Sequence, residues 1–187
     1  ATSSKQDSTP SCGNNISTMK LYLMTDLEGP AGVNRWEQAR VDDSPLKTCA
    51  MRLLTGEVNA AIEGILSVAP EAEIVVLDGH GYGGLVFEEL HPRARFLMRG
   101  VGLAAPFHLD PTFDAVLFIG QHAMEGTPNA PLCHTYSSKT SEEFKRDGAR
   151  RGEIGCCASI AGNMGVPVIF LSGDDKACAE ARAILPS

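Results

Sequence analysis

The sequence predicts an α/β domain with a mainly parallel sheet, helices on both faces and a small hairpin. Two features predict this fold: short, continuous apolar runs typical of buried strands, and longer segments with helical spacing of apolar residues between them. Strands and helices that alternate along a chain indicate a parallel sheet, because a crossover helix returns the chain to the same end of the sheet. With 187 residues, 43% of them hydrophobic, the chain can bury the core of one such domain.

The first two elements are a strand and a long helix. The strand covers residues 21–24, which are all apolar. The helix is expected to begin with Ser44 as its N-cap and Pro45 as its first residue, and Pro70 ends it. Its predicted apolar face consists of the residues at helical spacing, namely Leu46, Ala50, Leu53, Val58, Ala61, Ile62 and Ile65.

Three more apolar runs predict buried strands, over residues 74–77, 115–119 and 166–171. A polar stretch separates the last two of these runs. The Asp147-Gly148 dipeptide within it predicts the turn of a hairpin.

The remaining elements are two helices near the C-terminus. One is expected from about Glu153 to Gly162 or Gly165. Another is expected to end at Leu185, with Asp174 or Asp175 as its cap.

The charge of the chain excludes several classes of partner. Its net charge is −7 and its pI is about 5.2. Nucleic acids and anionic membranes both require basic patches, so we expect neither as a partner. No apolar run approaches the roughly 20 residues of a membrane span.

The chain is expected to consist of a disordered N-terminal arm, residues 1–18, and one α/β domain, residues 19–187. Its six cysteines form no C-x-x-C pair, and we expect at least four of them to be buried, reduced thiols. Reduced thiols favour a reducing compartment, so the expected location is the cytoplasm, although the N-terminal arm leaves export open.

Metal-binding residue types occur where the predicted strands end. Asp26 and Glu28 follow the first strand, Asp78 and His80 follow the second, and His122 follows the third. Ligand sites of parallel sheets lie outside the carboxyl ends of the strands. Residues two apart in an extended chain face the same way. Asp26 and Glu28 can therefore bind one metal centre together, and so can Asp78 and His80. Asp and Gly are also common turn formers, which is the alternative explanation for these positions.

A glycine-rich segment in the same region resembles a nucleotide-binding loop. Residues 79–84 match G-x-G-x-x-G after a strand. The acidic residue that normally follows about 20 positions later is missing, and no clear helix follows the glycines. We therefore do not expect a nucleotide site. The chain also lacks the P-loop, zincin and serine-hydrolase motifs.

Several short motifs, taken together, resemble those of a known family. The motifs that carry the resemblance recur in the order of the zinc-dependent D-aminopeptidase family, of the DppA type (peptidase family M55). They are residues 23–29, 78–80, 120–123 with 127–128, 133–135 and 152–155, and residues 173–175 also fit. The resemblance extends from Met19 to the end of the chain.

The resemblance implies a centre with two zinc ions per chain. The ligands it implies are Asp26, Glu28, His80, His122 and Glu153. Asp26 would bridge the two ions, Glu28 and His80 would complete one, and the other two residues would complete the second. Three carboxylates and a bridging hydroxide would balance the charge of two zinc ions. We also expect Asp78 to accept a hydrogen bond from the other ring nitrogen of His80.

The activity implied by the resemblance is hydrolysis of the N-terminal amide bond of short D-amino-acid peptides of the D-Ala type, by a hydroxide that bridges the metals. His134 would be the catalytic group, either stabilising the oxyanion or passing a proton to the leaving amine. The resemblance also implies a homo-oligomeric ring. Because members of the family continue well beyond the last helix, we expect the family's C-terminal part to be missing here.

Two alternatives stay open, another dinuclear metallohydrolase acting on cell-wall γ-D-glutamyl peptides, and an inactive homologue that binds metal or peptide. Several polar residues outside the motifs are expected to be solvated instead of functional. These are His91, His108, Glu125, Arg150 and Arg151, of which Glu125 could serve as a general base and the two arginines could contact a substrate carboxylate.

Overall fold

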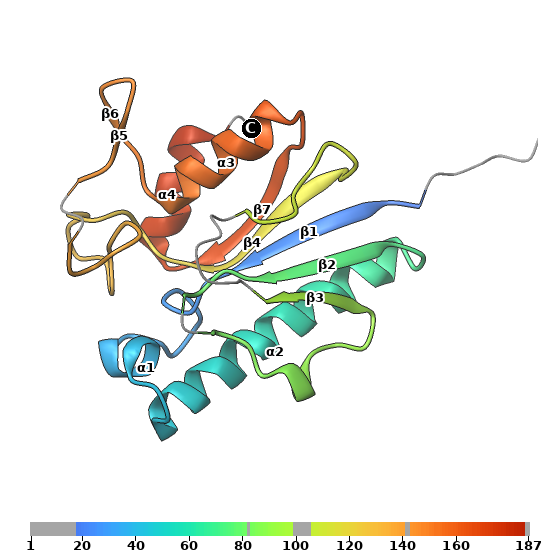
Figure 1. Cartoon of the computed structure of the whole chain (residues 1–187), viewed down its shortest axis with the longest axis horizontal. Helices are drawn as coiled ribbons and strands as arrows, with labels where there is room; N and C mark the ends of the chain where they lie inside the picture. The colour runs from blue at the N-terminus through green and yellow to red at the C-terminus, as the bar shows by residue number, and fades with distance from the viewer. Residues whose placement is uncertain (1–17, 82, 99–105, 141–142, 186–187) are drawn as a thin grey trace, which may run out of the picture.

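The computed structural model describes residues 18–81, 83–98, 106–140 and 143–185 and confirms the predicted α/β class (Figure 1). Five parallel strands form one sheet in the order β3-β2-β1-β4-β7. Their bounds are β1 Lys20–Thr25, β2 Glu73–Asp78, β3 Ala94–Met98, β4 Ala115–Gln121 and β7 Val168–Gly173. Residues 1–17 of the expected disordered arm lie outside the described residues.

The strand order reverses beside the central strand. From β1 the chain adds β2 and then β3 on one side, and it then crosses to add β4 and β7 on the other. The crevice at the carboxyl ends of β1 and β4 is therefore the switch point where sheets of this type bind ligands.

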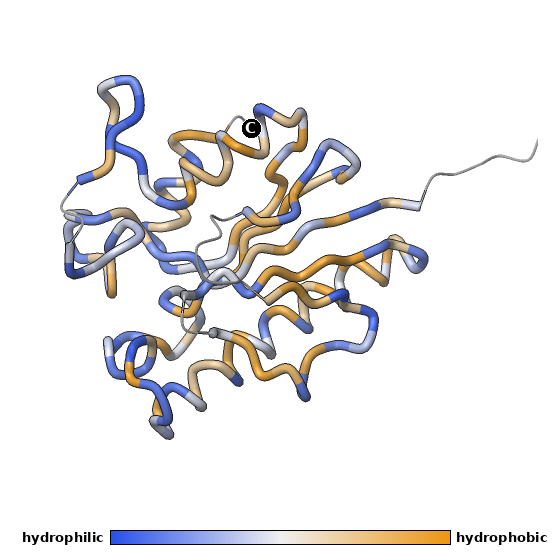
Figure 2. Tube along the Cα trace, in the orientation of Figure 1, coloured by the Kyte–Doolittle hydropathy of each residue, from blue (hydrophilic) through white to orange (hydrophobic). Residues whose placement is uncertain are grey.

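Helices cover both faces of the sheet (Figure 1). Helix α2 (Pro45–Val68) packs on the face to which Leu21 and Leu23 of β1 point. Tyr22 and Met24 point to the other face, which α3 (Glu153–Asn163) and α4 (Asp175–Ile184) cover. This alternation is the period-two pattern of a strand buried on both sides. Figure 2 shows apolar residues concentrated along the central strands, between polar loops.

Helix α2 begins as predicted, because the Ser44 side chain accepts a hydrogen bond from the Leu46 backbone N–H at 3.2 Å. Its buried face differs from the prediction. Leu46 and Leu53 are exposed, whereas Leu54 is fully buried. Leu53 and Leu54 each fit an apolar stripe along the helix. The contact with the sheet selects the stripe that runs through Ala50, Leu54, Val58 and Ile62.

The hairpin and the C-terminal helices agree with the predictions. The hairpin consists of β5 (Lys145–Arg146) and β6 (Ala149–Arg150). The Asp174 side chain caps α4, because it accepts hydrogen bonds from the backbone N–H groups of Lys176 and Ala177 in the first turn of the helix. Three elements were not predicted, namely α1 (Trp36–Arg40), the short 3-10 helix η1 (Phe87–Glu89) and strand β3. None of the helices in the described part of the chain is both long and apolar enough to cross a lipid bilayer.

The prediction that at least four cysteines are buried is wrong. Among the described residues, Cys156 and Cys157 are buried, Cys133 and Cys178 are half-buried, and Cys49 is exposed. Cysteine is apolar enough for a core, but a position on the outer side of a helix leaves it in contact with solvent. All five are free thiols.

Candidate metal centre

The carboxyl ends of three adjacent strands deliver the predicted metal-ligand residues to one place. Asp26 and Glu28 lie in the turn after β1, His80 lies two residues after β2, and His122 directly follows β4. All four side chains are buried, with 8% or less of their surface exposed. Charged groups are rarely buried without strong partners, so this clustering itself requires an explanation.

Close backbone contact shapes the turn after β1. The Asp26 N–H donates to the Ile119 carbonyl and the Gly29 N–H donates to the Gly120 carbonyl, both at 2.9 Å. A Cβ on Gly29 would overlap the backbone carbonyl of Gln121, so only glycine fits there. Gly120 has a φ of +75°, a backbone angle that residues with a side chain rarely adopt. These contacts hold the turn with its two acids against the end of β4.

The second half of the chain contributes Glu153, the first residue of α3, and His134, from the loop after β4. His122 Nε2 lies 3.3 Å from Asp26 Oδ2 and 3.4 Å from Glu153 Oε1. The His134 ring stacks on the His122 ring with centroids 3.9 Å apart, and its Nε2 lies 3.8 Å from Glu153 Oε1. The Tyr136 backbone N–H donates to the same Glu153 oxygen at 2.7 Å, which fixes the loop against α3.

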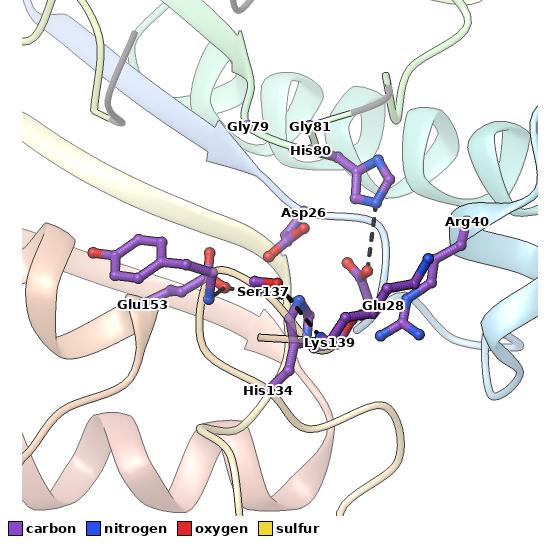
Figure 3. A pocket seen from close by; sticks show the side chains of 12 residues that line it. Asp26, Glu28, Arg40, Gly79, His80, Gly81, His134, Ser137, Lys139 and Glu153 are labelled. Atoms are coloured by element: carbon purple, nitrogen blue, oxygen red, sulfur yellow. Dashed lines mark hydrogen bonds and ion pairs between the residues drawn. The ribbon is translucent and has the colours of Figure 1, made fainter. Parts of the chain in front are cut away.

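His80 and Glu28 form the other side of the cluster. Their Nε2 and Oε1 atoms are 3.4 Å apart (Figure 3). The other ring nitrogen of His80, Nδ1, donates to the Gly83 carbonyl at 3.2 Å. A hydrogen bond of this kind fixes the tautomer in which Nε2 carries the lone pair that can bind a metal.

The acceptor for His80 Nδ1 is therefore a backbone carbonyl, and the expectation that Asp78 would fill this role is wrong. The Asp78 carboxylate instead accepts the backbone N–H groups of Gly84 and Leu85, at 2.9 to 3.3 Å. The glycine-rich segment thus wraps around an acid, and a 3-10 helix follows it in place of the long helix of a nucleotide site. The loop positions His80.

The arrangement fits a metal cluster. Two groups of side chains have ligand atoms within 4.8 Å of one another, Asp26 with Glu28 and His122, and His122 with His134 and Glu153. Glu28 Oε2 and His122 Nε2 are buried and have no hydrogen-bond partner among the described residues. Buried polar atoms in native proteins nearly always have partners, so an ion is the natural partner for these two. Carboxylate and imidazole together suit zinc.

The electrostatics of the cluster point the same way. Burial lowers the pKa of His122, but its contacts with Asp26 and Glu153 outweigh burial and raise the pKa well above its usual range. Burial likewise lowers the pKa of His80, but Glu28, together with the charge of Asp26 and the Gly83 hydrogen bond, outweighs burial and raises it above its usual value. The carboxylates thus favour positive charge at both rings, and a divalent cation can supply that charge in place of protons.

His134 differs from the other two histidines. Burial lowers its pKa, and the charge of the neighbouring His122 lowers it further. Its Nδ1 donates to the Leu132 carbonyl at 2.9 Å. A neutral His134 with that hydrogen bond carries its proton on Nδ1 and presents the Nε2 lone pair to the cluster.

The cluster opens into a pocket of about 260 Å³ (Figure 3). Two cationic side chains line it, Arg40 from the end of α1 and Lys139 from the loop after His134, together with Ser137 and Ser138. None of the sequence motifs includes these residues. Helix α1 is only five residues long and lacks a side-chain N-cap hydrogen bond, so its place beside the cluster had no signal in the sequence.

Glu125 is not the solvated carboxylate that the sequence suggested. It is buried, and its carboxylate accepts a hydrogen bond from the Thr135 hydroxyl and forms an ion pair with Arg150 at 3.0 Å. Arg150 is thus not simply solvated either. The Thr135 contact ties the loop after His122 to the segment that carries His134, and the Arg150 contact ties it to β6. His91 is half-buried and its Nε2 lies 3.0 Å from Glu63 Oε1, so it is not simply solvated, whereas His108 is exposed as expected.

Comparison with known proteins identifies relatives of this chain. The family model described as D-aminopeptidase, peptidase family M55, matches residues 19–187. A D-aminopeptidase of Bacillus subtilis (strain 168) is 33% identical over 175 residues, which are 90% of this chain and 61% of the relative. The solved structure of the Zn-dependent D-aminopeptidase DppA from Bacillus subtilis, described as a self-compartmentalizing protease, aligns with a TM-score of 0.82 at 31% identity. It too is matched over 61% of its length and 90% of this chain, so this chain spans about three fifths of the proteins it resembles.

Proposed function

The chain belongs to the D-aminopeptidase family, peptidase family M55, and on that basis we propose that it is a dinuclear zinc aminopeptidase that removes the N-terminal residue from short D-amino-acid peptides of the D-Ala type. The observation that carries the proposal is the convergence of five buried or half-buried metal-ligand side chains at the switch point of the sheet. Two of them carry a buried polar atom without a hydrogen-bond partner in the described structure.

The residues that would hold the zinc ions divide into two sets that share one carboxylate. Asp26 would be shared, since it touches His122 and lies in the same group as Glu28. Glu28 and His80 would complete one site, and His122 and Glu153 the other. Zinc ions bound there would act as Lewis acids toward a water molecule and toward the scissile carbonyl.

The chain's own contribution to the chemistry centres on His134. Because its neutral ring presents Nε2 to the pocket, it can accept a proton there and deliver it to the leaving amine. Stacking on His122 and the contact of Trp36 with its other side, at 5.5 Å between ring centroids, hold the ring in place. A fixed ring keeps the proton-accepting atom aimed at the pocket.

We also propose that the protein acts as a homo-oligomer. The support is the description of the DppA structure as a self-compartmentalizing protease. An enclosed chamber would restrict the substrates to short peptides, in keeping with a pocket of about 260 Å³.

The first test is metal content by elemental analysis, on protein purified without chelator. We expect about two zinc ions per chain. A panel of D-Ala-D-Ala, L-Ala-L-Ala, the two mixed dipeptides and a γ-D-glutamyl peptide then tests the substrate class. Cleavage that requires a D residue at the N-terminus supports the proposal. Absence of zinc after reconstitution, or cleavage of only the γ-D-glutamyl peptide, contradicts it.

The role of His134 is tested with His134→Gln, which keeps the size of the side chain. We expect kcat to fall by about 10²- to 10⁴-fold, the usual contribution of a general acid–base group, with the zinc content unchanged. His108→Asn is the matched control, because His108 is exposed and has a φ of +61° that asparagine tolerates. A loss of zinc in His134→Gln would show that His134 is a ligand, as its proximity to Glu153 permits.

A further inference from the structure

We propose that Arg40 binds the C-terminal carboxylate of the substrate, so that the pocket selects very short peptides with a free carboxylate, dipeptides above all. This inference rests on the proposed function. The sequence motifs do not include Arg40, and its side chain enters the pocket from α1, on the side of Glu28 (Figure 3).

The first observation is an unmatched donor. Arg40 Nη2 is buried, and no hydrogen-bond acceptor for it is present in the described part of the chain. A buried N–H group without an acceptor is costly, and native proteins retain such groups mainly at functional sites. Because the side chain lines the pocket, a ligand that enters the pocket can provide the missing acceptor.

The second observation is that the guanidinium is held in place. Its Cζ lies 3.2 Å from the centroid of the Trp36 ring, a cation–π contact. The same ring also contacts His134, edge-on at 74°. Trp36 thus connects the cation to the catalytic group, and a planar guanidinium fixed in this way is suited to bidentate binding of a carboxylate.

The third observation concerns charge. The negative charge of Glu28 stabilises the positive charge of Arg40, yet no ion pair joins the two within the described residues. With Glu28 as a zinc ligand, its charge would be committed to the metal, and Arg40 would be left without an ion-pair partner among the described residues. The exposed Lys139 adds a second positive charge to the same pocket. Both charges favour an anionic ligand group.

The size of the pocket determines which carboxylate this is. Its volume of about 260 Å³ is below the roughly 300–1,000 Å³ of sites for drug-sized ligands. In a dipeptide, the carboxylate lies only one residue beyond the scissile bond, so both can lie in this single pocket. An acidic side chain on the second residue offers the same chemistry, and the experiment separates the two sources.

The test compares three substrates in the zinc-loaded protein: D-Ala-D-Ala, its C-terminal amide, and the α-amide of D-Ala-D-Glu. In Arg40→Met, which keeps an apolar stem over Trp36, we expect the ratio of kcat/KM for the acid over that for the amide to fall by about 10- to 100-fold. The change should lie mainly in KM, because the carboxylate takes no part in the bond rearrangement. Arg40→Lys should restore part of the ratio, and Glu37→Gln on the exposed side of α1 is the control.

Each outcome decides the proposal. An equal fall for acid and amide would show that Arg40 only supports Trp36 and His134, and an unchanged ratio would show that the carboxylate binds elsewhere, so both overturn it. If Arg40→Met lowers kcat/KM for the α-amide of D-Ala-D-Glu but not for D-Ala-D-Ala, Arg40 binds a side-chain carboxylate. That result overturns its assignment to the C-terminal carboxylate. If the wild-type protein hydrolyses none of the three, the proposed function fails, and dissociation constants from calorimetry for the same ligands and variants test Arg40 by binding alone.

Discussion

Among individual residues, six buried polar side-chain atoms lack a hydrogen-bond partner in the described part of the chain, and half of them gather at the site. Three of them belong to it in the described structure, Glu28 Oε2, His122 Nε2 and Arg40 Nη2. Two are acceptors or lone-pair donors that suit a cation, and the third is a donor that suits an anion. A site with both kinds is equipped for a metal ion and for the charged end of a substrate.

A fourth such atom, Glu180 Oε1, leads to a prediction about pH. Glu180 is buried, and its other oxygen accepts the Met124 backbone N–H at 2.8 Å. Burial raises the pKa of its carboxyl, and the negative charges of Glu125 and Asp174 add to this, whereas the Met124 hydrogen bond and His122 oppose it. The folded protein therefore holds a proton on Glu180 at pH values where the unfolded chain, with a pKa of about 4.3, has lost it.

Stability must then fall as the pH rises from the unfolded pKa of Glu180 through its raised folded value, because the folded state binds more protons over that window. Glu180→Gln cannot ionise and avoids this loss. We expect the free energy of unfolding of Glu180→Gln, relative to wild type, to increase from pH 4 to pH 7.5, measured by urea unfolding. The exposed Glu37→Gln should show no such trend. A constant difference across the range would mean that Glu180 ionises normally in the folded protein.

Among the secondary-structure elements, the ones that the sequence predicted are those whose signal is local. Ser44 and Pro45 mark the start of α2, and the apolar run of β4 needs no neighbour to be recognised. Strand β3 was missed because it is an edge strand with Arg95 exposed and only partly buried apolar residues, so its pattern is weak. The exposure of Leu53 likewise depends on how α2 packs against the sheet, which the sequence does not specify locally.

The same distinction applies to the candidate site. Asp26, Glu28, His80 and His122 could be predicted because they directly follow strands, and a parallel sheet brings strand ends together. Glu153 needed the family resemblance, since an acid at the start of a helix is common for other reasons. Arg40 could not be predicted, because its place depends on a short helix and on the packing of Trp36.

The turn after β1 leads to a prediction about two glycines. Gly29→Ala would push its Cβ into the Gln121 carbonyl and move the turn that carries Glu28 away from β4. We expect it to lower the free energy of unfolding by about 1–3 kcal/mol and to weaken zinc binding. Gly64→Ala is the control, because outside its own stretch of α2 no atom lies within 4 Å of the added Cβ. It should stabilise the protein by roughly 0.5–1 kcal/mol.

Urea unfolding and a zinc titration check both variants of this pair. Equal stability of Gly29→Ala and wild type would mean that the contact between the turn and β4 is not tight. Normal zinc affinity in a destabilised Gly29→Ala would separate the turn's structural role from its role at the site.

For the whole molecule, the site joins the two halves of the sheet. Asp26, Glu28 and His80 come from the part before the strand order reverses, and His122 and Glu153 come from the part after it. Metal bound by both sets would connect β1 and β2 to β4 and α3. Binding energy of this kind adds directly to the stability of the fold, because an unfolded chain does not present the ligands together.

The final prediction follows from this connection. Zinc should raise the melting temperature in proportion to the logarithm of its free concentration, and at about 1,000 times the dissociation constant the stabilisation should be about 4 kcal/mol per site. Chelator should lower the melting temperature, because the buried Glu28 and His122 atoms then lose their partner. Asp26→Asn should reduce the response most, since Asp26 would serve both ions, and magnesium, which prefers oxygen ligands, should not replace zinc. A melting temperature independent of zinc in the wild-type protein would mean that the five side chains do not hold the ions in the folded state, whatever the protein's activity proves to be.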